Sequence, residues 1–490
     1  MTNPPSDTPR PLSEPPAHKD YDQLQGKVGR HALYRPDRFA LRDLVDQPNL
    51  FVLEVDGRPV LPRNFSLSGL SFRDPKKAEW PLGDHVRYSI RLGEDHLLSG
   101  EATIARADEK RRYVEVGLHS ATMLDYEALR IAEKELQWND GLRRGPRLFR
   151  DPVPSDYRRA VLDLGAFCQF YQNHLGKREL HHPGDARAIA EEAYPSMRPN
   201  WMELSREAAR AATTFLDDPS TLREARLVTE NVVTRHLIEA PVLRRAYEKP
   251  SGYPGDYVVM QHYFDNTFVG DSAFGMVFHK ITNEHPLSAG VRTRSAYVAD
   301  AIARRSSAHG HDDPLRVLSL GSGVGAEVGL VHAASTSPVR WTLIDQEDEA
   351  LAMAYRNARA LAPAGGRLPE VACVNLSFSQ LFSGEVSPNS WGQQDVIFAL
   401  GLFDYLRPQG ASMLLAALYS LLRDGGTVFI ANAAAPNFHF WEPELALRWS
   451  LIYRDEKEME ALGAVLPASA TTELGMESAG AYYVLSCQKP

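Results

Sequence analysis

The sequence predicts a multidomain protein with an N-terminal β-barrel, a helical middle region and a C-terminal α/β unit of the Rossmann-like kind. Three observations indicate this order. Short alternating apolar segments extend to about residue 122, helical apolar spacing extends to about residue 245, and a later strand runs into Gly321, Gly323 and Gly325. The expected boundaries are 1–25 for a tail, 26–123 for the barrel, 124–248 for the helices and 249–490 for the α/β unit.

In the N-terminal quarter of the chain, the residue pattern changes after the first 25 residues. The first 25 residues are proline-rich and polar, and we expect them to be disordered. Beyond them, short segments alternate or cluster apolar residues between turn signals such as Leu82-Gly-Asp, which predicts a small β-barrel. These segments are 51–55, 86–92, 100–105 and 113–118.

Two short motifs lie in the predicted barrel. Arg38 and Arg42 form an Arg-x-x-x-Arg element, and Asn64-Phe-Ser66-Leu-Ser-Gly69 stands between two strands. Their order and separation resemble the PilZ domain, the bacterial receptor for cyclic di-GMP. The resemblance implies that Arg38, Arg42, Asn64, Ser66 and Gly69 bind this regulatory ligand. Guanidinium groups form forked hydrogen bonds to phosphate and guanine, although either motif alone is also consistent with a solvated surface.

Residues from about 124 to 245 have apolar side chains at three- and four-residue spacing, which predicts helices. Breaks such as Pro183-Gly184 mark helix ends or linkers. We expect this region to act either as a cap that connects the barrel to an active site or as a passive scaffold.

Residues 317–325 read Val-Leu-Ser-Leu-Gly-Ser-Gly-Val-Gly, a strand that ends in a glycine-rich loop before a helix. Glycines let the backbone approach a ligand, and a helix N-terminus favours anionic or polar ligand groups. As Gly-x-Gly-x-x-Ala the loop fits the dinucleotide fingerprint. With its third glycine it resembles the first motif of class I S-adenosylmethionine (SAM) methyltransferases. Asp345, at the end of the next strand, suits ribose hydroxyls in both cases.

The segments after residue 390 favour the methyltransferase class. A strand over 395–400, a helix over 411–422, a Gly-Gly turn and a strand over 427–432 precede a terminal hairpin. This order resembles class I methyltransferases, whose last strand is antiparallel. That family usually has an acidic residue where this chain has Ser319, so a contact to the methionine amino group is weaker here or comes from elsewhere. The resemblance implies SAM as cofactor, with contacts from Gly321, Ser322, Gly323, Gly325, Asp345, Gln346, Asn375, Leu400 and Gly401.

A distinctive segment, Gly252-Tyr-Pro-Gly-Asp-Tyr257, precedes the cofactor loop. With the region 150–490, it resembles the bacterial methyltransferase family of 3-hydroxypalmitic acid methyl ester biosynthesis, whose members carry Gly-Tyr-x-Gly-Asp-Tyr. The resemblance implies methyl transfer to the carboxylate of a 3-hydroxy fatty acid, a quorum-sensing signal in some bacteria, or to a similar small acyl substrate.

Methylation of a carboxylate needs no strong general base, because the carboxylate is already a nucleophile at neutral pH. Alignment and exclusion of water would supply most of the rate. The candidate catalytic residues are hydroxyl donors, an arginine, a histidine and an aspartate that fixes their loop: Tyr253, Asp256, Tyr257, Arg294 and His439. Each can instead be structural, and Asp256 can simply cap the following helix.

Length and charge restrict other possibilities. The chain has 490 residues, a formal net charge of -9 and three scattered cysteines. The acidic balance argues against general nucleic-acid binding, and the cysteines form no metal or disulfide pattern. Without a membrane-spanning run or a signal peptide, we expect a cytoplasmic protein with no stable membrane insertion and no bound metal. A homodimer is compatible with the sequence.

Two other functions stay open: a dinucleotide-dependent oxidoreductase, and a catalytically inactive protein-docking module controlled by cyclic di-GMP. Hydrolases fit less well, since the sequence contains neither Gly-x-Ser-x-Gly, nor His-Glu-x-x-His, nor a P-loop.

Overall fold

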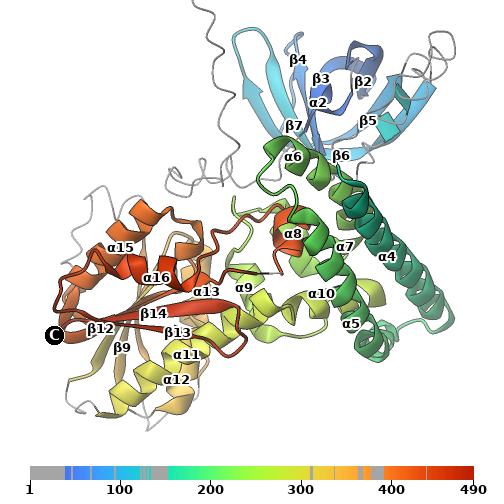
Figure 1. Ribbon diagram of the computed structural model, residues 1–490. Helices are drawn as coiled ribbons and strands as arrows, with labels where there is room; N and C mark the ends of the chain where they lie inside the picture. Colours follow the sequence, from blue (N-terminus) through green and yellow to red (C-terminus); the bar gives the residue numbers. More distant parts are fainter. Residues whose placement is uncertain are drawn as a thin grey trace, which may run out of the picture.

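The computed structural model contains three parts. Figure 1 shows a β-barrel at the top, long helices below it on the right, and an α/β sheet at the lower left. The predicted fold class is thereby confirmed. The described residues are 39–45, 48–66, 69–92, 95–121, 124, 128–129, 132–133, 153–308, 313–335, 337–361, 368–376, 391–437 and 439–490. The predicted tail, residues 1–25, and Arg38 lie outside them.

The N-terminal sheet closes on itself. Its strand order is β1-β3-β2-β5-β6-β7-β4, and β3 also pairs with β4, so β2 to β7 form a barrel with the short β1 along β3. Alternation builds the strands: in β2, Phe51, Leu53 and Val55 are buried. The elements are β1 (Phe39–Ala40), α2 (Leu41–Leu44), η2 (Pro48–Leu50), β2 (Phe51–Val55), β3 (Arg58–Ser66), β4 (Gly69–Asp74), β5 (His85–Leu92), β6 (Asp95–Glu109) and β7 (Val114–Ser120).

Helices connect the barrel to the second sheet. The break predicted at Pro183-Gly184 is confirmed, since it separates the packed pair α4 (Ser155–His181) and α5 (Ala186–Ala212). α5 continues through Pro195 and Pro199, and its inner face keeps Met197 and Trp201 buried. The other helices are α6 (Pro219–Thr229), η3 (Glu230–Thr234), α7 (Arg235–Leu237), α8 (Pro241–Glu248), α9 (Tyr257–Asp265), α10 (Ala273–Asn283) and α11 (Pro286–Ala308).

The C-terminal sheet has the order β10-β9-β8-β11-β12-β14-β13. The strands from β10 to β12 run parallel, and β14 lies antiparallel between β12 and β13, as expected for a terminal hairpin. The strands are β8 (Leu315–Leu320), β9 (Val339–Asp345), β10 (Glu370–Asn375), β11 (Gln394–Ala399), β12 (Leu422–Ala433), β13 (Thr471–Met476) and β14 (Tyr482–Gln488). The chain order reverses between β8 and β11, and ligands of open α/β sheets bind beyond the carboxyl ends of the strands at such a point.

Helices cover both faces of this sheet. Adjacent residues of β11 pack on opposite faces of the sheet. Phe398 packs with residues of α11, α12 and α13, whereas Ile397 packs with residues of α15 and α16. The helical elements not yet given are α12 (Ala326–Ala334), α13 (Asp348–Arg359), η5 (Phe403–Tyr405), α15 (Pro408–Ser420), η6 (Glu442–Ala446) and α16 (Glu456–Gly463).

The segment between β12 and α16 leaves the sheet and packs among the middle helices. Trp441 Nε1 donates to the Tyr157 hydroxyl at 3.1 Å, and the Thr234 hydroxyl donates to the Ala446 carbonyl at 2.9 Å. η6 therefore shares the core of the helical part. This packing brings the middle helices against the carboxyl edge of the sheet.

No described helix has the length and apolarity needed to cross a membrane. Within the described ranges, no cluster of three or more His, Cys, Asp or Glu side chains is arranged to hold a metal ion.

Candidate functional site

The glycine-rich loop follows β8 at the carboxyl edge of the sheet. The amides of Gly321 and Ser322 donate to the Ile344 carbonyl at 2.8 and 3.0 Å. Gly321 and Gly325 have φ angles of 70° and 66°, and a Cβ at Gly325 would lie 3.0 Å from the Ala354 Cβ. Glycine is therefore required for this left-handed backbone and for close packing directly before α12.

Asp345 ends β9 beside this loop. One carboxylate oxygen accepts from the Gly323 amide at 2.8 Å, and the other accepts from the Glu347 amide at 3.0 Å. Carboxylate oxygens accept more than one hydrogen bond, so a carboxylate at the edge of the loop is a suitable acceptor for ribose hydroxyls.

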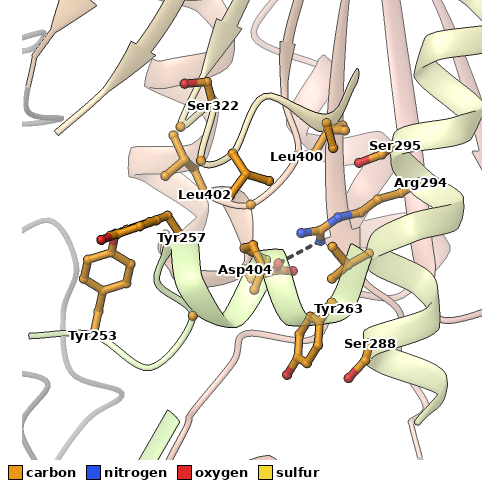
Figure 2. A pocket seen from close by; sticks show the side chains of 18 of the residues that line it. Tyr253, Tyr257, Tyr263, Ser288, Arg294, Ser295, Ser322, Leu400, Leu402 and Asp404 are labelled. Carbon is orange, nitrogen blue, oxygen red and sulfur yellow. Dashed lines mark hydrogen bonds and ion pairs between the residues drawn. The ribbon is translucent and has the colours of Figure 1, made fainter. Parts of the chain in front are cut away.

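A cavity opens beyond the carboxyl ends of β8, β9 and β11, with about 1430 Å³ of empty space including its mouth. Figure 2 shows Ser322 and Leu402 at one end, Tyr263 and Ser288 at the other, and Arg294 and Asp404 between them. The cofactor candidates that line it are Gly321, Ser322, Gly323, Asp345, Gln346, Leu400 and Gly401. The aromatic side chains that line it are Tyr253, Tyr257, Tyr263, Phe264, Tyr405, Trp449 and Tyr482.

Two cofactor candidates lie outside the lining residues. Gly325 packs against α13, as described above, and Asn375 is exposed at the end of β10, where its neighbour Leu376 lines the cavity instead. The Ser322 hydroxyl, by contrast, is buried in the lining and has no hydrogen-bond partner among the described residues.

Arg294 and Asp404 form a buried ion pair in the cavity wall. Arg294 Nη1 lies 3.5 Å from Asp404 Oδ2, and the side chains are 7% and 5% exposed. The Arg294 guanidinium lies 4.2 Å from the centroid of the Tyr482 ring, and its Nε lacks a hydrogen-bond partner in the described part of the chain. Burial raises the pKa of Asp404, although the positive charge of Arg294 opposes this shift. Arg294 therefore offers a desolvated cation to an anionic group in the cavity.

Glu442 and His285 also line the cavity, and sequence reasoning missed both. Burial raises the pKa of Glu442 to about 7, and its Oε1 accepts from the Thr282 hydroxyl at 3.3 Å. Burial, helped by nearby His439, lowers the pKa of His285 to about 3, so the ring is neutral. No motif marks these residues, because they reach the cavity only when the segment after β12 packs on the middle helices.

The five catalytic candidates take different positions. Tyr253, Tyr257 and Arg294 line the cavity, whereas Asp256 and His439 do not. The His439 ring lies beside that of His285, with 5.5 Å between centroids.

Asp256 is the N-cap of α9. Its Oδ1 accepts from the amides of Val258 and Val259 at 3.2 and 3.1 Å, and its Oδ2 accepts from Arg245 at 2.8 Å. These contacts fix the start of α9 and therefore the two tyrosines on either side of Asp256.

A second hollow lies on the barrel. Asn64 stands opposite Ala40 in the β1–β3 register, and its Oδ1 accepts from the Ser71 hydroxyl at 2.6 Å. Both Asn64 and the exposed Arg42 line the hollow. The positively charged side chains of its lining are Arg42, Arg63, Arg73 and Lys76, of which sequence reasoning identified only the first. Such a lining suits a ligand with phosphate groups.

Residues 38–133 match the family model of the PilZ domain. The match includes every strand of the barrel, from β2 to β7, and the short β1. In this PilZ barrel, Ser66 and Gly69 lie in register across β3 and β4, away from the hollow's lining. The Ser66 hydroxyl donates to the Gly69 carbonyl at 3.2 Å. A Cβ at Gly69 would lie 2.1 Å from the Leu118 carbonyl oxygen, so close strand packing requires glycine there.

Solved structures similar to this chain include a possible exported protein from Bordetella parapertussis, at 18% identity and a TM-score of 0.42, covering 57% of this chain and 97% of that chain. Magnesium protoporphyrin IX methyltransferase from Synechocystis PCC 6803 with bound SAM has 17% identity and a TM-score of 0.30, covering 42% of this chain and 84% of that chain. The 1,6-didemethyltoxoflavin-N1-methyltransferase of Burkholderia thailandensis has 19% identity and a TM-score of 0.28, covering 40% of this chain and 79% of that chain. No curated protein sequence matches the chain.

Proposed function

We propose that this protein is a SAM-dependent methyltransferase that responds to cyclic di-GMP bound at its PilZ barrel. One observation carries the proposal: a single cavity joins the glycine-rich loop and Asp345 to a chamber that contains Arg294 and aromatic side chains. The sheet order, with the antiparallel β14 between β12 and β13, supports the methyltransferase class over a dinucleotide-dependent oxidoreductase.

The loop end of the cavity is suited to the cofactor, which supplies an electrophilic methyl group when bound. Asp345 would accept the ribose hydroxyls, and the Ser322 hydroxyl would contact the methionine portion. Ser319, where the related family has an acid, does not line the cavity. Glu327 does, and its buried carboxylate, to which Ser295 donates at 2.6 Å, would receive the methionine ammonium instead.

The other end is suited to the acceptor. Its lining combines the Arg294 guanidinium with aromatic side chains, in the same cavity as the glycine-rich loop, so an acceptor would lie beside the cofactor. Arg294 would orient an acceptor carboxylate, and Tyr253, Tyr257 and Trp449 would pack along an acyl chain. The chain's own residues would then align the reactants and exclude water, which suits a nucleophile that needs no deprotonation. A 3-hydroxy fatty acid or a similar small acyl acid is the acceptor we propose.

Isothermal titration calorimetry with SAM, S-adenosylhomocysteine and NAD tests the cofactor. We expect both sulfur compounds to bind and NAD not to bind. Binding of NAD without binding of either sulfur compound would contradict the proposal and favour the oxidoreductase.

A further inference from the structure

Phe39 lies at the boundary between the PilZ barrel and the rest of the molecule. It belongs to β1, whose next residue, Ala40, pairs with Asn64 of the hollow, and Arg42 follows on α2. Phe39 itself is 6% exposed although it stands at the edge of the barrel. Its ring is covered by Arg448, whose Cζ lies 4.4 Å from the ring centroid. A residue directly beside the hollow thus contacts the segment between β12 and α16.

Arg448 is held in an unusual position. It is 8% exposed, and its guanidinium forms a buried ion pair with Glu230 of η3, which also accepts from the Tyr247 hydroxyl. Its φ angle is 51°, in the left-handed region that residues other than glycine rarely adopt. Such a backbone persists when its contacts maintain it. The stacking on Phe39 and the pair with Glu230 are two of the contacts that hold this residue in place.

The residues on both sides of Arg448 line the cofactor and acceptor cavity. The carbonyl of Leu447 accepts from the buried Lys249 Nζ at 2.9 Å. The indole Nε1 of Trp449 donates to the Tyr405 hydroxyl at 2.7 Å. A Cβ at Gly255 would lie 2.7 Å from the indole, so Trp449 also packs against the loop before α9. A shift of Arg448 would move two adjacent residues of the cavity wall.

We propose that Arg448 is the positioning residue through which the PilZ barrel controls the cavity. Ligand binding between Arg42 and Asn64 would move β1, and Phe39 would transmit this movement through Arg448 to Leu447 and Trp449. The inference rests on the proposed function and names the route of its regulation.

Hydrogen exchange of the full chain, with and without saturating cyclic di-GMP, tests this route. In the wild type, the amides of residues 442–451 should change their exchange rate by about fivefold or more, the lower end of typical coupling between sites. Phe39→Leu keeps an apolar side chain but removes the ring. Arg448→Lys keeps the charge but removes the guanidinium that stacks on Phe39 and pairs with Glu230. In either variant, cyclic di-GMP should change these exchange rates by less than about twofold. The affinity of each variant for cyclic di-GMP, measured by calorimetry, should stay within about threefold of the wild-type affinity.

Arg58→Ala is the matched control. It removes a stacking contact with Trp80 in the same barrel, away from the junction, and should respond as the wild type does. The inference is overturned if both junction variants keep the full response, or if the wild type binds cyclic di-GMP without any change in residues 442–451. Failure of the proposed function looks different: the wild type would then not bind cyclic di-GMP, or would not bind S-adenosylhomocysteine.

Discussion

At the scale of single residues, Asp345 and Arg294 lie in the two parts of the cavity that we propose for the cofactor and the acceptor. Asp345 is fixed by two backbone amides, which pre-organises its carboxylate at the edge of the loop. Arg294 is fixed by Asp404 and by the Tyr482 ring, which keeps a positive charge in a desolvated wall. Both residues are therefore placed before any ligand arrives.

Asp345→Ala should weaken S-adenosylhomocysteine binding by about 10- to 100-fold, because hydrogen bonds to a charged group contribute about 1.5–3 kcal/mol. Titration calorimetry measures this change. Asp348→Ala, which removes an exposed acid from the first turn of α13, is the control and should leave the affinity unchanged. Equal affinities of the wild type and Asp345→Ala would remove the ribose assignment.

Glu442 predicts a pH dependence of stability. Its folded-state pKa of about 7 lies above its ordinary value of 4.5, so the folded protein retains a proton that the unfolded chain loses as the pH rises through this window. Stability should therefore fall between about pH 4.5 and 7. Glu442→Gln should not show this loss, because glutamine does not titrate. The difference in free energy of unfolding between the variant and the wild type should therefore shift in favour of the variant by about 1–3 kcal/mol from pH 5 to pH 8.

Urea unfolding at pH 5 and pH 8 measures this difference. Glu460→Gln alters an exposed acid on α16 and should follow the wild-type curve. If the Glu442→Gln and wild-type curves run parallel, Glu442 does not hold the extra proton.

The local sequence pattern predicted some of the residues that line the cavity but not others. Gly321 and Asp345 lie at strand ends that the sequence marks, and both line the cavity. Glu442 and His285 could not be predicted, because no local pattern places η6 against the start of α11. Asn375 shows that a strand end alone does not determine which side chain lines the cavity. It is the last residue of β10, but its side chain is exposed, and the next residue, Leu376, lines the cavity instead.

At the scale of elements, the start of α9 and the PilZ barrel each hold candidate binding side chains on a fixed backbone. Asp256 caps α9 and pairs with Arg245, so Tyr253 and Tyr257 are held on the cavity wall. In the barrel, pairing of β1 with β3 brings Arg42 near Asn64 although the motifs are separate in sequence.

Asp256→Ala should lower the free energy of unfolding by about 1–3 kcal/mol, through loss of the cap and an unpaired Arg245. Urea unfolding measures this loss. Asp265→Ala, at the exposed end of the same helix, is the control. A loss no larger than that of the control would show that Asp256 does not anchor α9.

Arg42→Ala and Arg38→Ala should each abolish cyclic di-GMP binding at micromolar concentrations of the ligand, because the phosphates lose a forked cationic partner. The affinity for S-adenosylhomocysteine, measured on the same samples by calorimetry, should stay within about twofold. Parallel loss of both ligands would mean that these arginines are structural.

At the scale of the whole molecule, the order of barrel, helices and sheet followed from changes in apolar periodicity along the chain. The packing of the segment between β12 and α16 on the middle helices did not follow from these changes. Its partners Tyr157, Thr234 and Lys249 lie between 198 and 284 residues earlier in the chain. This long-range packing closes the cavity against the helices and gives the barrel its contact with Arg448.

The most direct test is mass spectrometry of bacterial lipid extracts incubated with the full chain and SAM labelled in its methyl group, with and without cyclic di-GMP. We predict labelled methyl esters of acyl acids, in amounts that change with cyclic di-GMP and that fall in Asp345→Ala when SAM is not saturating. The account would be contradicted if no labelled product formed under either condition and the same preparation bound NAD but not SAM.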